Sequence, residues 1–109
     1  MREIEFKVPP DCNFARAEPL IEKACAEHGL LAAMKGSLAT YAGSVHWHYK
    51  QPKQKGTLEL TLLPAERRIW AQVHTNRAAP WIDELLPRIQ GDIEKALEAA
   101  ANGSRRRLQ

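Results

Sequence analysis

The stretch VHWHYKQPKQKGTLELTLLPAERRIWAQVHT, residues 45–75, decides the fold of this chain. Apolar and polar residues alternate within it in three runs, at 45–50, 57–63 and 68–75. Alternation with a period of two is typical of strands that bury one face and turn the other toward water. The sequence therefore predicts three consecutive antiparallel strands at the centre of the fold.

Two short polar connections join these runs. The first, 51–56, contains Pro and Gly, and the second, 64–67, is short enough for a hairpin and begins with a Pro that cannot extend a central strand. The lengths of the connections predict a register, and the alternation opposes a slip by a single residue. This register sets three rows of side chains on the polar face: His46-Thr61-Trp70, His48-Glu59-Gln72 and Lys50-Thr57-His74.

The segments before this region predict a strand, a helix and a further strand. Residues 2–8 alternate as a half-buried strand does and end at a Pro-Pro pair. Apolar residues between Ala17 and His28 recur at helical spacing, and Gly29 follows as a helix-terminating residue. Residues 30–41 favour a strand with a bulge at Gly36, followed by a turn at Ala42 and Gly43.

The segment after this region carries a long helical pattern. Apolar residues recur along one stripe from Pro80 to Ala101, and Asn102-Gly103 is a typical helix end. Pro87 falls inside the pattern, which predicts either a kink or a restart of the helix there. Residues 1–103 form one predicted domain, and 104–109 form a predicted disordered basic tail.

The predicted fold class is α+β, with an antiparallel sheet and the element order strand, helix, four strands, helix. Two helices packed on one face of the sheet would cover every apolar stripe in the chain. This order resembles the TATA-binding-protein-like, or helix-grip, arrangement. The resemblance is one of topology, so it implies an architecture and no function.

Composition narrows the classes of function. Three of the sixteen basic residues lie at Arg105, Arg106 and Arg107, so the remaining thirteen balance the thirteen acidic residues of the chain. The first residues are charged and no apolar run reaches transmembrane length, so we expect a soluble cytoplasmic protein without membrane contact. Cys12 and Cys25 lie far apart and lack metal spacing, so they are expected to be reduced thiols, and Cys25 falls on the apolar stripe of its helix.

The leading functional prediction is a binding or interaction module that uses the polar face of the sheet. An exposed Trp on such a face is a typical interface anchor, and a two-fold homodimer or another protein partner is expected there. The predicted binding surface consists of His46, His48, Glu59, Trp70, Gln72 and His74.

A metal site is the first alternative. His46 and His48 lie two residues apart on one strand, so both project from one face, roughly 7 Å apart at the backbone. Two imidazoles placed in this way can converge on one divalent ion, with Glu59 or His74 as a further ligand. These four residues are the predicted metal ligands of a metal-binding protein or metal-dependent enzyme.

A weak nucleic-acid binder is the second alternative. Basic residues gather near the turns of the three central strands, and Trp70 and His74 have rings on which bases can stack. The neutral body of the chain and the absence of an RNA-binding signature oppose this interpretation. The acids and histidines show no triad spacing, and the chain has no phosphate-binding motif. No catalytic residue is therefore predicted, and the sequence favours a binding protein over an enzyme.

Overall fold

The computed structural model describes the backbone of residues 1–107 and the side chains of residues 1–101. Within these residues it contains a five-stranded antiparallel sheet and two α-helices, which confirms the predicted α+β class and order of elements. The sheet has the strand order β1-β5-β4-β3-β2. The elements are β1 (Arg2–Glu5), α1 (Ala17–Glu27), β2 (Leu31–Leu38), β3 (Tyr41–Lys50), β4 (Leu58–Leu63), β5 (Arg68–Val73) and α2 (Pro80–Arg107), with 3-10 turns η1 (Phe14–Arg16), η2 (Pro64–Glu66) and η3 (Thr75–Arg77).

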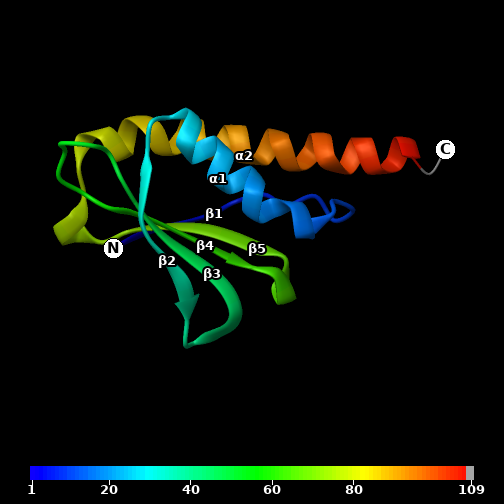
Figure 1. The fold of residues 1–109 in the computed structure, drawn as a ribbon, viewed down its shortest axis with the longest axis horizontal. Helices are drawn as coiled ribbons and strands as arrows, with labels where there is room; N and C mark the ends of the chain where they lie inside the picture. Colours follow the sequence, from blue (N-terminus) through cyan, green and yellow to red (C-terminus); the bar gives the residue numbers. More distant parts are fainter. Residues whose placement is uncertain (108–109) are drawn as a thin grey trace.

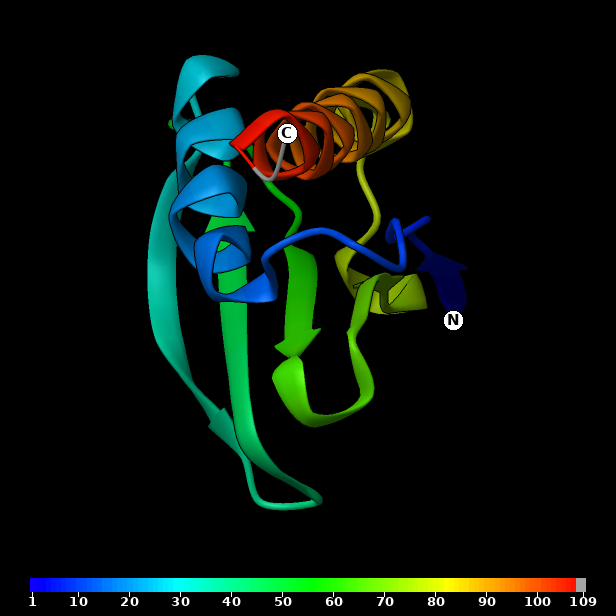
Figure 2. The ribbon, with the colours of Figure 1, turned by 90° about the vertical axis from the view of Figure 1, so that its right-hand side faces the viewer.

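Both helices lie on the same face of the sheet (Figures 1 and 2). The alternating apolar residues of the central strands point toward them and are almost completely buried. The core between the sheet and the helices is built mainly from Trp47, Tyr49, Leu58, Leu60, Leu62, Ile69, Ala71, Ile21, Cys25, Ile82, Leu86, Ile89 and Ile93. The chain therefore has one apolar core on one side of its sheet, and the polar residues of the same strands form the opposite face.

The two helices differ in how well their ends match the prediction. Gly29, with φ +77°, ends α1 as expected, because a residue without a Cβ adopts this left-handed conformation without strain. The second helix is continuous through Pro87 and extends to Arg107, past the end predicted at Asn102-Gly103. Pro87 is exposed, so the carbonyl that it leaves without an amide partner can be hydrated. Part of the tail that was predicted to be disordered, residues 108 and 109, lies outside the described residues.

The hairpin of β2 and β3 curls away from the helices (Figure 1), and its second strand, β3, begins earlier than predicted. Its turn falls at residues 39–40 rather than at Ala42-Gly43, because strand pairing resumes at Tyr41 opposite Leu38. Gly43 has φ +78° within β3, where it allows the strand to bend. The register shifts between Ala32 and Met34 and between Gly36 and Leu38, so the bulge expected at Gly36 is confirmed.

Strand β2 forms one edge of the sheet and is exposed along nearly its whole length. Leu31 and Met34 are its exposed large apolar side chains. Among the described residues, no helix is both long enough and apolar enough to cross a membrane.

Candidate metal centre

The register of the three central strands brings the polar side chains together as predicted. His48 lies opposite Glu59 and His46 lies opposite Thr61 in the pairing of β3 with β4. In the pairing of β4 with β5, Glu59 lies opposite Gln72, and Thr61 lies opposite Trp70. Side chains directly opposite one another on the same face are within reach of each other, so these pairings place two histidines beside one carboxylate.

The carboxylate of Glu59 is the centre of the site, and its two oxygens have different neighbours. Its Oε1 atom lies 3.1 Å from Nε2 of His46 and 3.6 Å from Nε2 of His48. Its Oε2 atom lies 3.1 Å from Nε2 of His74 and 3.6 Å from Nη1 of Arg77. One oxygen therefore faces the His-x-His pair, and the other faces the end of β5 and the turn that follows it.

The side chains on the Oε1 side could hold a divalent metal ion. The potential ligand atoms of His46, His48 and Glu59 all lie within 4.8 Å of one another. Two ligands of a tetrahedral zinc ion, each about 2.1 Å from the metal, stand about 3.4 Å apart. The separations from Oε1 to the two imidazole nitrogens lie on either side of that value. Two imidazoles and one carboxylate also form the ligand set of non-haem iron centres.

His74 was predicted as a further ligand, but the structure gives it another position. Its Nε2 approaches Oε2, the oxygen turned away from the His-x-His pair. A group that binds the second oxygen of a ligating carboxylate orients that ligand rather than the metal itself. His74 is therefore placed to hold Glu59 in position, with its side chain 42% exposed.

Thr61 supplies a second orienting contact that follows from the same register. Its Oγ1 atom lies 2.8 Å from Nδ1 of His46, and both side chains are buried. A hydroxyl can donate or accept, so it can partner His46 in either neutral tautomer. When Nδ1–H donates to Thr61, the lone pair of Nε2 is free for a metal, which is the arrangement that ligating histidines usually show.

Burial separates the inner from the outer part of this site. His46 is 3% exposed and Glu59 is 6% exposed, whereas the side chain of His48 is 25% exposed. Desolvation lowers the pKa of His46, while the nearby carboxylate of Glu59 opposes this shift. Buried charges in proteins are paired or bind metals, so Glu59 requires the polar groups that surround it. The solvent-facing part of the site is formed by the partly exposed side chains of His48, His74 and Arg77.

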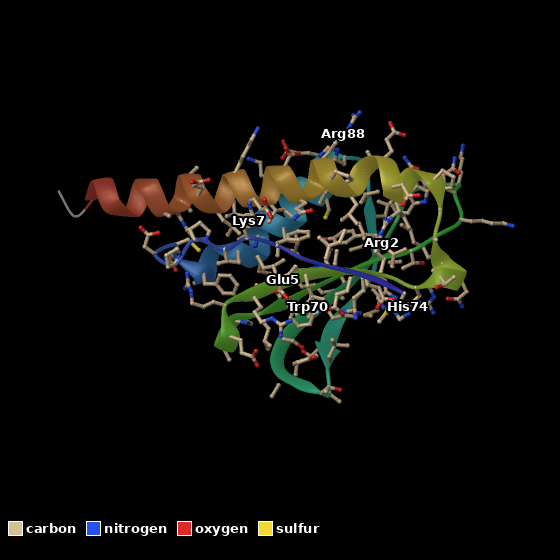
Figure 3. The ribbon with its side chains drawn as sticks, turned by 180° about the vertical axis from the view of Figure 1, so that it is seen from behind. Arg2, Glu5, Lys7, Trp70, His74 and Arg88 are labelled. Carbon is tan, nitrogen blue, oxygen red and sulfur yellow. The ribbon has the colours of Figure 1, made fainter. Side chains whose placement is uncertain are left out.

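Trp70 is buried, in contrast to the exposed position expected from its parity. It is 3% exposed, because the ring of Tyr41 packs edge-on against it at 5.3 Å and the guanidinium of Arg68 lies 4.5 Å from its ring. Tyr41 comes from the curled hairpin, and Figure 3 shows Trp70 on the side of the sheet away from the helices. The remaining residue of the predicted surface, Gln72, donates to Glu3 on β1 at 3.2 Å. The predicted partner or dimer contact on this face stays a prediction.

Arg77 is the residue of this site that sequence reasoning did not assign to it. It lies in η3, three residues after His74, so its approach to Glu59 depends on how the chain turns after β5. The recognisable signal is a cation three residues after His74, which directly follows β5 and shares the polar face of the sheet. Comparison with models of protein families, with curated proteins and with solved structures finds no match to this chain.

Proposed function

We propose that this protein binds one divalent transition-metal ion through Nε2 of His46, Nε2 of His48 and Oε1 of Glu59. The observation that supports the proposal best is the division of the Glu59 carboxylate between two sets of neighbours. One oxygen shares a small space with two imidazole nitrogens, while the other is held by His74 at 3.1 Å, and Arg77 lies farther from it, at 3.6 Å. Zn²⁺ and Fe²⁺ are both matched to this set of ligands.

The same geometry favours a metal with exchangeable positions over a purely structural ion. Structural zinc sites are usually closed by four protein ligands, whereas reactive sites keep three protein ligands and an open position. Three potential ligands lie together here, and the side chain of one of them, His48, is 25% exposed. The apolar core lies on the opposite face of the sheet, so the fold has a source of stability that does not depend on the ion. A metal in this place would act as a Lewis acid or would activate a bound water.

Zinc titration monitored by NMR of the four histidine side chains tests this proposal. We expect one zinc per chain, with stoichiometric shifts at His46 and His48, and no stoichiometric shift at His28. His28 is a suitable internal reference, because it lies at the end of α1 and its Nε2 contacts Asp92 on α2 at 2.7 Å. The absence of a selective shift at a twofold excess of zinc would refute the proposal for that metal.

Matched substitutions separate ligands from orienting groups. His46→Gln and His48→Gln are expected to abolish stoichiometric zinc binding, whereas His28→Gln is expected to leave it unchanged. His74→Gln is expected to weaken zinc binding by about 10- to 100-fold, because outer contacts to a ligand typically have effects of that size. Equal effects of all four substitutions would contradict the assignment, and isothermal titration calorimetry distinguishes these outcomes.

A further inference from the structure

The position of Arg77 suggests what the open side of the metal centre binds. Its backbone is fixed on both sides, because its N–H donates to the carbonyl of His74 and its carbonyl accepts from the N–H of Thr57. Its side chain remains 46% exposed beside the buried carboxylate of Glu59. A fixed backbone and a half-exposed guanidinium allow the side chain to reach both the site and the solvent in front of it.

The contact between Arg77 and Glu59 leaves the guanidinium free to recognise another anion. Nη1 lies 3.6 Å from Oε2, which is longer than the 2.7–2.9 Å of a charge-assisted hydrogen bond. At that distance the attraction is electrostatic and the N–H donors are not committed to Glu59. The Oε2 atom already has a closer neighbour in His74, at 3.1 Å.

The charge around the loaded site would be positive. A divalent ion exceeds the single charge of Glu59, and Arg77 adds a further positive charge within the same cluster. Lys50 follows His48 on the same face of β3, and it is exposed. Lys55 is exposed in the loop before β4, two residues from Thr57, whose N–H donates to the carbonyl of Arg77. A partly desolvated centre with this charge attracts small anions.

We propose that the metal centre binds a small oxyanion, of the carboxylate or phosphate-monoester class, and that Arg77 is the residue that recognises it. One oxygen of the anion would occupy an open coordination position, and the remaining oxygens would accept from the guanidinium. A guanidinium suits this role because its planar fork matches both carboxylate and phosphate geometry. This inference rests on the proposed metal site.

The test uses protein loaded with Co²⁺, whose visible absorption responds to a change in coordination, and two probes, acetate and methyl phosphate. We expect at least one probe to bind the loaded protein and to bind the metal-free protein much more weakly. The probe that binds more tightly identifies the class of the anion. Arg77→Gln is expected to weaken that binding about tenfold, as the loss of one charge-assisted contact does.

A matched control and a second readout make the test specific. Arg88→Gln is the control, because Arg88 is exposed on α2, on the other side of the molecule from His74 (Figure 3). It should change neither metal nor anion affinity. Arg77→Gln should leave Co²⁺ affinity unchanged or increase it, since a cation near the metal is removed. Opposite effects on metal and anion cannot result from general destabilisation.

The two proposals fail in different ways. If Co²⁺ binds but neither probe changes its spectrum, or if Arg77→Gln binds the probe as tightly as the original protein, the anion proposal is wrong and the metal proposal stands. If neither Co²⁺ nor Zn²⁺ binds, both proposals are wrong. Loss of metal affinity in Arg77→Gln would overturn the role of Arg77 in recognition and would make it a positioning residue for Glu59.

Discussion

Replacing Thr61 with Val removes one hydroxyl from the buried part of the candidate metal centre and nearly conserves the volume of the side chain. Thr61 is 0% exposed, and its Oγ1 atom lies 2.8 Å from Nδ1 of His46, which is itself 3% exposed. The substitution leaves this nitrogen without its partner in a place that water does not readily reach. Two separate consequences follow, one for the stability of the metal-free protein and one for its affinity for metal.

The expected loss of stability is about 1–2 kcal/mol. Leaving a buried polar group unsatisfied costs about 1–3 kcal/mol. The additional buried methyl of Val offsets this by about 0.8 kcal/mol. Zinc affinity is expected to fall about 10- to 100-fold, because His46 loses the contact that orients its ring and fixes its tautomer.

Urea unfolding of the metal-free protein and calorimetric zinc titration measure the two effects separately. Thr61→Ser is the informative companion, since it keeps the hydroxyl and creates a small cavity. It should lower stability by about 1 kcal/mol while retaining zinc affinity. Thr57→Val is the matched control, because Thr57 is also buried just before β4 and has the same parity as Thr61.

Two results would refute this reasoning. One is a Thr61→Val protein that binds zinc as tightly as the original, since the hydroxyl would then have no part in orienting His46. The other is an equal loss of zinc affinity in Thr57→Val, since the effect would then arise from any change in the strand. Both comparisons are valid only if the slope of the unfolding free energy against urea concentration is the same in each variant as in the original protein.

Three further outcomes are expected. Gly56→Ala should destabilise the protein by more than about 2 kcal/mol, because Gly56 has φ +105° and a Cβ there would lie 2.6 Å from that of Ala79. Gly91→Ala, in open space on α2, should instead stabilise the protein by about 0.5–1 kcal/mol. Urea unfolding that ranks the two variants the other way would contradict this expectation. Burial raises the pKa of Cys25 to about 12, so at pH 8 only about one thiol in ten thousand is a thiolate. Iodoacetamide should therefore label Cys25 only after the protein is unfolded in urea. Rapid labelling of the folded protein would contradict the burial of this thiol. Zinc at one hundred times its dissociation constant should raise the free energy of unfolding by about 2.7 kcal/mol, a chelator should reverse this, and an unchanged thermal midpoint would argue against the site.

The arrangement of the central strands was predictable from sequence because two local signals agree there. Alternation assigned each side chain to a face, and the short turns limited the register, so the pairing of His48 with Glu59 followed from residue spacing alone. The proximity of three of the four predicted ligands follows from the same reasoning. The positions that differ depend on contacts between residues distant in sequence.

Trp70 and His74 illustrate why such contacts escaped prediction. Parity placed Trp70 correctly on the polar face, but its burial depends on Tyr41, which reaches it only because the hairpin of β2 and β3 curls. His74 approaches the opposite oxygen from that facing His46 and His48, and that choice depends on side-chain rotation, which alternation does not specify. The helix α2 passes Asn102-Gly103 for a different, local reason, since a favourable end signal competes with the tendency of the flanking residues to continue a helix.

Because side chains alternate along β3, neighbouring residues of this strand lie on opposite faces of the sheet. Trp47 and Tyr49 anchor the core on one face, while His46 and His48 build the candidate centre on the other. A slip of β3 by one residue against β4 would therefore place imidazoles in the core and remove both from Glu59 at once. An ion that binds only the correctly aligned pair would select that alignment by mass action. Metal binding would then increase the fraction of chains in which β3 and β4 are paired in the correct register.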